Sequence, residues 1–171
     1  AATVFLSITT LDAELARKLE PRASSPRHRL EAVEALAKAG IPVGVMTAPI
    51  IPALNDSEIP AILTAAARAG AKSAGYVMLR LPFGLKELFA AWLQEHFPDR
   101  KEKVLHRLEE LSGGKLYDAA FGKRQTGAGV FAEQIAQLFE VGLKKAGLSQ
   151  RGVQLSTESF RRPAAPQMSL F

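Results

Sequence analysis

The sequence predicts an α/β fold in which a parallel sheet is followed by a small helical C-terminal region. Three extended runs (residues 4–12, 41–52 and 72–82) alternate with two runs of helical periodicity (residues 29–40 and 58–70). Strand–helix–strand spacing of this kind builds parallel sheets, which bind ligands at the carboxyl ends of their strands. Because the chain opens directly on an extended run, with no helix before it, we expect half of a parallel barrel whose other half is missing.

The composition indicates a chain with a genuine core. Hydrophobic residues make up 47% of its 171 residues, which is enough for one ordinary domain or for a half-barrel with a small helical unit. No run reaches the ~18–20 apolar residues of a membrane span, and no basic segment opens the chain as in a signal peptide, so we expect a cytoplasmic protein. The absence of cysteine excludes disulfides, thiolate catalysis and cysteine-ligated clusters within these residues.

The formal charge of +5 is concentrated in the C-terminal section. Residues 1–99 hold 10 Lys or Arg and 10 Asp or Glu, whereas residues 100–171 hold 12 and 7. A basic section of this kind suits a polyanionic partner such as nucleic acid. An ordinary solvated basic surface explains the same composition equally well.

The first extended run alternates between an apolar face and a face that combines Phe5 with the hydroxyls of Ser7 and Thr9. The interior of a barrel near a ligand has this mixed character. A short helical turn over residues 11–19 should follow. It should stop at residues 20–22, because the residue before a proline avoids helical dihedrals.

The segment Ser24-Ser25-Pro26 should open the next helix, because serine is a good N-cap and Pro26 fits the first turn, and the helix should end at Gly40. Two prolines, Pro49 and Pro52, then remove backbone donors from the end of the second run. We therefore expect this run to leave the sheet at its carboxyl end. Residues 55–57 should supply the N-cap of the following helix.

The third extended run ends at Arg80, just before Pro82. From the sequence this arginine is either a ligand contact or a salt-bridge partner, with neither favoured. Beyond it the pattern predicts helices over residues 85–97, 100–111 and 130–146, and the chain from residue 149 on is typical of a tail. The expected organisation is residues 1–83, 84–148 and 149–171.

The segments SITTLD, LEPR, AGIPVGV, APIIPALND and GYVMLRLP together resemble the C-terminal half of the radical S-adenosylmethionine barrel. The likeness is greatest to bacterial proteins related to spore photoproduct lyase and called DNA repair photolyase-like, and it covers residues 4 to about 114. The resemblance implies a partial parallel (β/α)6 barrel. A three-cysteine motif there binds a [4Fe–4S] cluster, and S-adenosylmethionine chelates its open iron. The resemblance also implies that this chain starts at the fourth strand, without the cysteine motif.

The resemblance further implies a set of cofactor-facing residues at the strand ends: Ser7, Thr9, Arg22, Ile50, Ile51, Arg80 and Leu81. The two hydroxyls would lie near the ribose or methionine group, Arg22 would hold the methionine carboxylate, and the two isoleucines would flank the adenine. Arg80 and Leu81 would lie near the cofactor or the substrate. Each position also has an ordinary alternative, as an interior hydroxyl, a core side chain or, for Arg22, a partner of Glu20 or Asp12.

The last five residues carry a second motif. Gln167, Met168, Leu170 and Phe171, with a serine between, resemble the short motif by which bacterial polymerases and repair proteins bind the sliding clamp. A proline- and alanine-rich segment would present the two terminal apolar side chains to a pocket. The alternative is that Leu170 and Phe171 fold back onto the domain.

Three functions remain open from the sequence. The first is a radical S-adenosylmethionine enzyme that acts on or near nucleic acid, of which residues 1–171 alone would be inactive for lack of cluster ligands. The second is a DNA-associated module that binds the sliding clamp. The third is a different α/β enzyme in which Ser7, Thr9 and Arg22 bind a phosphate. The three histidines lie too far apart for a metal motif, and an exposed first strand predicts self-association.

Overall fold

The computed structural model describes residues 2–111, 125–152, 154–158 and 161. Within them one parallel sheet has three strands in the order β1-β2-β3. The strands and helices are β1 (Val4–Ser7), α1 (Ala13–Leu19), α2 (Pro26–Lys38), β2 (Val43–Ile50), the 3-10 turn η1 (Asp56–Glu58), α3 (Ile59–Arg68), β3 (Ser73–Met78), α4 (Leu85–His96), α5 (Pro98–Leu111) and α6 (Val130–Ala146).

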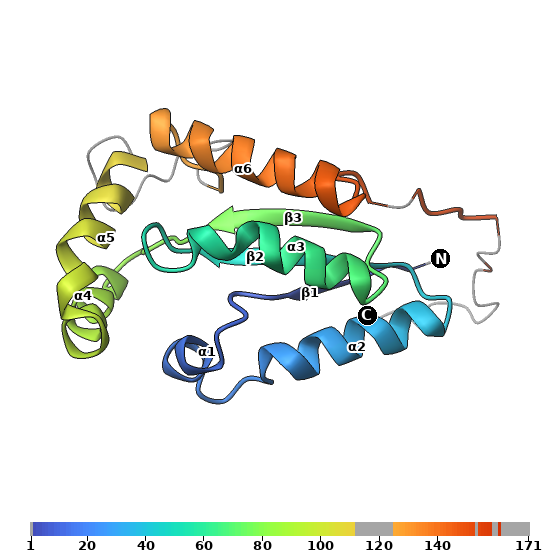
Figure 1. Cartoon of the computed structure of the whole chain (residues 1–171), viewed down its shortest axis with the longest axis horizontal. Coiled ribbons are helices and arrows are strands. Elements are labelled where there is room, and N and C mark those ends of the chain that lie inside the picture. Colours follow the sequence, from blue (N-terminus) through green and yellow to red (C-terminus); the bar gives the residue numbers. More distant parts are fainter. Residues whose placement is uncertain (1, 112–124, 153, 159–160, 162–171) are drawn as a thin grey trace, which may run out of the picture.

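The expected half of a (β/α)6 barrel is wrong for this chain. The three strands form an open sheet with β1 and β3 at opposite edges, and six α-helices accompany it among the described residues. A barrel needs enough tilted strands for the sheet to close on itself. Three strands in sequential order cannot do so, and the sheet remains open (Figure 1).

One face of the sheet is covered by α2, α3 and α6, which run alongside the strands (Figure 1). Buried side chains of Val43 and Val45 on β2 meet Val33 of α2 and Leu63 of α3 there, and Phe139 of α6 completes the core. Helices α1, α4 and α5 lie instead beyond the carboxyl ends of the strands (Figure 1). They carry a second apolar cluster, separate from the first.

The opposite face of the sheet is built from small and flexible residues. A Cβ on Gly44 would lie 2.4 Å from the ring of Phe5, and a Cβ on Gly75 would lie 2.9 Å from the sulfur of Met46. These two side chains therefore lie across the glycines of neighbouring strands. Phe5 remains 44% exposed, so this face is only partly covered within the described residues.

Local signals place the helices around the sheet as the sequence predicts. The Ser25 hydroxyl accepts the His28 N–H at 3.3 Å, and α2 begins at Pro26. Gly40 follows the end of α2 at φ +73°, a conformation that costs glycine little. The helix expected over residues 130–146 is confirmed as α6. No helix of the described residues is both long enough and apolar enough to cross a membrane.

The two edges of the sheet differ. The outer edge of β3 is bonded at both ends, because Ala74 N–H donates to the Ser149 carbonyl at 3.0 Å and Met78 N–H to the Gln125 carbonyl at 2.8 Å. On β1, the Ser7 carbonyl accepts a hydrogen bond from Arg29 at 2.9 Å. Self-association through β1, an edge strand of four residues, stays a prediction.

Candidate functional site

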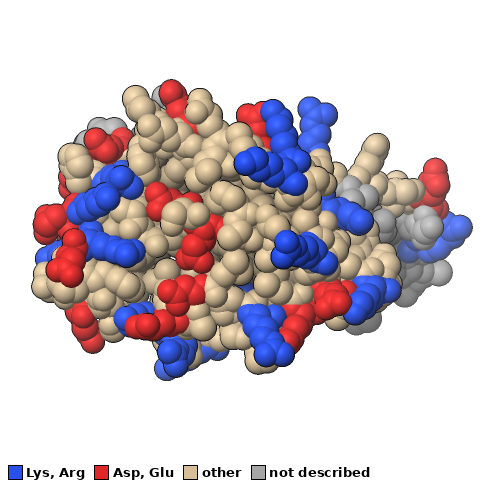
Figure 2. Space-filling view, viewed as in Figure 1, with Lys and Arg blue, Asp and Glu red and all other residues tan. Residues whose placement is uncertain are grey.

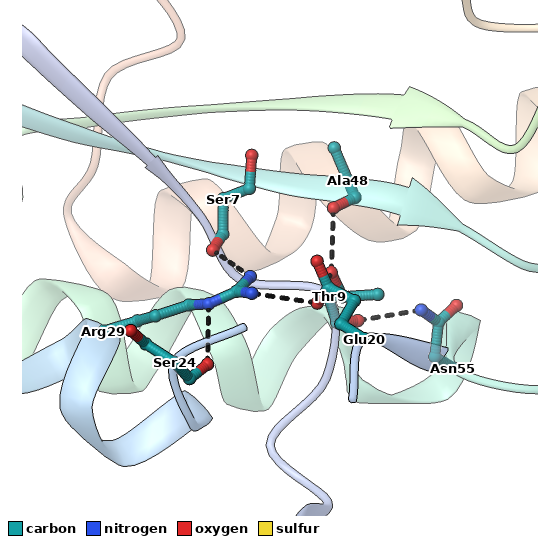
Figure 3. Close-up of polar contacts among 7 residues, drawn as sticks. All are labelled: Ser7, Thr9, Glu20, Ser24, Arg29, Ala48 and Asn55. Atoms are coloured by element: carbon teal, nitrogen blue, oxygen red, sulfur yellow. Dashed lines mark hydrogen bonds and ion pairs between the residues drawn. The ribbon is translucent and has the colours of Figure 1, made fainter. Parts of the chain in front are cut away.

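Polar groups converge where β1 and β2 end. Thr9 follows β1, Asn55 follows β2, Glu20 and Ser24 lie on the connection between α1 and α2, and Arg29 projects from α2 (Figure 3). Ligands of open parallel sheets bind at this edge because the strands end there and loops take over. The segments that connect the strands therefore supply both the residues that line this site and its charged groups.

Arg29 is the central cation of this site. Its Nε donates to the Ser24 carbonyl at 3.0 Å, its Nη1 donates to the Ser7 carbonyl at 2.9 Å, and its Nη2 lies 3.1 Å from Glu20 Oε2 (Figure 3). Its side chain is 15% exposed. These contacts use three of the five N–H donors of a guanidinium and orient its plane.

Glu20 links the arginine to the strand end. The Thr9 hydroxyl lies 3.0 Å from Glu20 Oε2 and 3.1 Å from the Ala48 carbonyl oxygen (Figure 3). A hydroxyl has one proton, so Thr9 donates to one of these acceptors at a time. The Glu20 side chain is 35% exposed and so keeps access to a ligand or to solvent.

Asn55 bonds to backbone groups at the ends of both strands. Its Nδ2 donates to the carbonyl oxygens of Thr9 at 2.8 Å and Pro49 at 3.0 Å, and its Oδ1 accepts the Ile51 N–H at 2.6 Å. The residue is 2% exposed. The expected N-cap role of this segment is not observed for Asn55, whose side chain makes no capping bond to η1. Its side-chain amide instead bonds to backbone groups at the ends of β1 and β2. The amide is therefore buried with its hydrogen bonds satisfied.

Two hollows flank the Arg29–Glu20 pair. A cavity of about 310 Å³ lies between α1 and α2 and includes Thr9, Arg17, Glu20 and Arg29 in its lining. A more open hollow of about 360 Å³ lies on the side of β1, and its lining includes Ser7 together with the same Glu20 and Arg29. The paired charges thus face both spaces, and each space suits a small polar molecule or one end of a larger one.

The predicted cofactor-facing residues fall into separate places. Thr9 is buried and lines the cavity, and Ser7 is exposed and lines the open hollow. Arg22 is exposed on the connection between α1 and α2 and is not among the residues that line either space. Ile50 and Ile51 are 2% and 0% exposed, which makes them core residues.

Arg80 and Leu81 belong to a third place, which we call the α4 groove. It is a depression of about 370 Å³ against α4, with one charged member in its lining: Leu19, Leu79, Arg80, Leu81, Leu85, Leu88, Phe89 and Trp92. Leu81 is 3% exposed. The groove also lies beyond the carboxyl ends of the strands. Helix α1 lies between the groove and the cavity, because its Leu19 lines the groove and its Arg17 lines the cavity.

Sequence reasoning missed Arg29, Glu20 and the bridging role of Asn55. A signal for Arg29 was present, because the first turn of α2 carries no acidic residue and two arginines. Helix N-termini disfavour cations, but the signal does not single out Arg29, because Arg27 in the same turn pairs with Glu31 of α2 itself. The partners of Arg29 lie up to 22 residues away along the chain.

The described residues do not fit an iron–sulfur cluster. The chain has no cysteine, and within residues 2–111, 125–152, 154–158 and 161 no group of three His, Cys, Asp or Glu residues could hold a metal ion. Thiolates are the usual ligands of such clusters.

The charged surface is mixed where it can be seen. Figure 2 shows basic and acidic side chains interspersed over the face it presents. In the C-terminal section, the described residues carry eight Lys or Arg and six Asp or Glu, so most of the basic excess lies at other positions. Gln167, Met168, Leu170 and Phe171 also lie outside the described residues, and the clamp-binding motif stays a prediction.

Comparison with known proteins finds distant relatives. Uncharacterized proteins of Mycobacterium tuberculosis and Mycobacterium bovis are each 32% identical over 111 residues, which are 64% of this chain and 32% of the relative. The chain therefore spans about a third of the length of the curated relatives it matches. No family model matches the chain, and no solved structure matches it significantly.

Proposed function

We propose that this chain supplies S-adenosylmethionine-binding residues to a radical S-adenosylmethionine protein. The observation that carries the proposal is the Arg29–Glu20 pair, 3.1 Å apart at the carboxyl ends of the strands and bordered by two hollows. The sequence resemblance names the ligand. The radical chemistry of that family needs a reduced cluster, whose ligands this chain does not contain.

The pair suits the methionine end of the ligand, which carries a carboxylate and an ammonium group. Two N–H donors of Arg29 remain beyond its contacts with Ser24, Ser7 and Glu20, and a guanidinium is well matched to a carboxylate. The Glu20 carboxylate is an acceptor for an ammonium group. In this proposal Arg29 replaces Arg22 as the carboxylate-binding residue, because Arg22 lines neither hollow.

The test is isothermal titration of the full chain with S-adenosylmethionine and with its decarboxylated analogue. The wild-type chain should bind the intact ligand more tightly, by about tenfold or more, since hydrogen bonds to charged groups contribute about 1.5–3 kcal/mol. Arg29→Ala should lose this discrimination, whereas Arg22→Ala should keep it. A merely structural role for Arg29 would weaken both ligands equally.

Three outcomes would contradict the proposal. They are no binding of S-adenosylmethionine at millimolar concentration, loss of discrimination in Arg22→Ala instead of Arg29→Ala, and binding of simple phosphate esters in its place. Circular dichroism of each variant controls for folding. Arg29→Lys keeps the charge and should retain part of the discrimination.

A second candidate function is delivery to DNA through the bacterial sliding clamp. The residue pattern that favours it is Gln167, Met168, Leu170 and Phe171 after a proline- and alanine-rich segment. The full chain should bind purified clamp by surface plasmon resonance, and a variant with Leu170→Ala and Phe171→Ala should not. Equal binding by both chains would remove this candidate.

A further inference from the structure

The cavity between α1 and α2 contains a cation that the proposed function does not use. Arg17 lines it together with Arg29 and Glu20, and these three are the charged residues of its lining. The Arg29–Glu20 pair also lines the open hollow on the side of β1, whereas Arg17 does not. The methionine end of S-adenosylmethionine can therefore be held at the open hollow, which leaves the cavity for a second ligand.

The two carboxylates closest to Arg17 in the sequence are bonded to other cations. Glu14 lies 2.7 Å from Lys18, and Glu20 lies 3.1 Å from Arg29. Within the part of the chain that the structure describes, the Arg17 side chain makes no hydrogen bond or ion pair. The N–H donors of its guanidinium are thus available to a ligand at the cavity.

The charge of the lining favours a monoanion. Two guanidinium groups and one carboxylate leave a net charge of +1, because Glu20 neutralises Arg29. A carboxylate matches this charge and the planar geometry of a guanidinium. A dianion such as a phosphate monoester would bring one negative charge in excess close to Glu20, where like charges repel.

The two threonine hydroxyls of the lining are already engaged as donors. The Thr10 hydroxyl donates to Glu58 Oε1 at 2.6 Å, and the Thr9 hydroxyl donates either to Glu20 or to the Ala48 carbonyl. A hydroxyl has one proton, so neither has a second one for a ligand. The guanidinium groups are therefore the main donors that a ligand in the cavity would meet.

Much of the remaining wall is small and apolar. It consists of Ala13, Ala16, Pro21, Ala23 and Pro26. The volume of about 310 Å³ lies at the lower end of the ~300–1,000 Å³ that small-molecule sites occupy. Short side chains on the wall leave room for an aliphatic chain, whose burial there would remove apolar surface from water.

We propose that the cavity between α1 and α2 is a second binding site, which takes a short aliphatic monocarboxylate. The carboxylate pairs with Arg17, and the alkyl chain packs against the alanines and prolines of the wall. This inference goes beyond the proposed function. Its test needs no S-adenosylmethionine, so the two can fail separately.

The experiment is a titration of the isotope-labelled full chain with valerate at constant ionic strength, followed by proton–nitrogen correlation spectra. The affinity is taken from the amide signals of Ala23 and Ser24, which line the cavity. Arg17→Ala should weaken binding by about three- to tenfold, as expected for a charged hydrogen bond that solvent partly screens. Ala16→Leu, which narrows the cavity without changing its charge, should weaken binding by at least as much. Arg27→Ala, which removes an exposed arginine outside the lining, should change the affinity by less than about twofold.

Separate ligands and variants distinguish the possible results. Pentanol has the chain of valerate without its charge and should bind at least about threefold more weakly. Circular dichroism controls for folding, and Arg17→Ala should fold normally because it shortens an exposed side chain. Equal affinity of the wild type and Arg17→Ala for valerate, equal affinity for pentanol, or tighter binding of inorganic phosphate would overturn the assignment.

Competition between the two ligands separates this inference from the proposed function. Displacement of valerate by S-adenosylmethionine would assign the cavity to the methionine end and would overturn a second site. Simultaneous binding of both ligands would support the two sites. Arg17-dependent binding of valerate by a chain that does not bind S-adenosylmethionine would support this inference and refute the proposed function.

Discussion

Replacement of Asn55 by alanine should destabilise the chain strongly, because this side chain ties the two strand ends together. Its amide bonds to the carbonyl oxygens of Thr9 and Pro49 and to the Ile51 N–H, at 2.8, 3.0 and 2.6 Å. All three partners are backbone groups, and Asn55 is 2% exposed. Water is therefore poorly placed to replace the lost partner.

The magnitude follows from these contacts. A buried N–H left unsatisfied costs about 1–3 kcal/mol, and loss of a hydrogen bond at each of two carbonyl oxygens costs about 0.5–1.5 kcal/mol apiece. The sum for Asn55→Ala is about 2–6 kcal/mol. Carbonyl oxygens that gain another donor or a water would bring the value toward the lower end.

The assay is urea unfolding followed by far-ultraviolet circular dichroism, with the m-value checked for constancy. Gln94→Ala is the matched control, since the Gln94 amide is exposed and its recorded bond is to Lys101 at 3.2 Å. It should change the free energy of unfolding by less than about 0.5 kcal/mol. A loss below about 1 kcal/mol for Asn55→Ala would refute the bridging role.

Three further predictions concern the fold away from the site. Gly40→Ala should lower the free energy of unfolding by about 1–2 kcal/mol because the residue has φ +73°, and Gly40→Asn should lose less since Asn tolerates this conformation; equal losses in urea unfolding would contradict this. Phe139→Ala should lower the free energy of unfolding by about 3–5 kcal/mol, because residue 139 is 1% exposed and its ring centroid lies 4.7 Å from that of Tyr76. A decrease below about 1.5 kcal/mol in urea unfolding would argue against a tightly packed core. Burial raises the pKa of the Tyr76 phenol, so the folded state holds the phenolic proton to higher pH than the unfolded state does. The free energy of unfolding should therefore fall as pH rises above about 10, and Tyr76→Phe should weaken this fall. Identical slopes of the free energy of unfolding against pH for both chains would count against this.

The secondary structure could be predicted from the sequence over most of the described residues. Helical spacing and the Ser25, Pro26 and Gly40 signals predict α2, and the apolar stripe of residues 130–146 predicts α6, both as observed. These signals are local, since each depends on residues within a few positions of one another. Closure of the sheet depends on strand number and stagger, so the expected half-barrel was wrong and the sheet is open.

The candidate site shows the same division. The sequence by itself determined that the first extended run would carry the hydroxyls of Ser7 and Thr9 and that prolines would end the second run, at the edge where parallel sheets bind ligands. Only the tertiary structure decided that Arg29 rather than Arg22 meets Glu20, and that Asn55 bonds to Thr9 across 46 positions. The physical reason is that a polar side chain bonds to whichever group the packing of distant elements brings within about 3 Å of it, and no local pattern specifies that group.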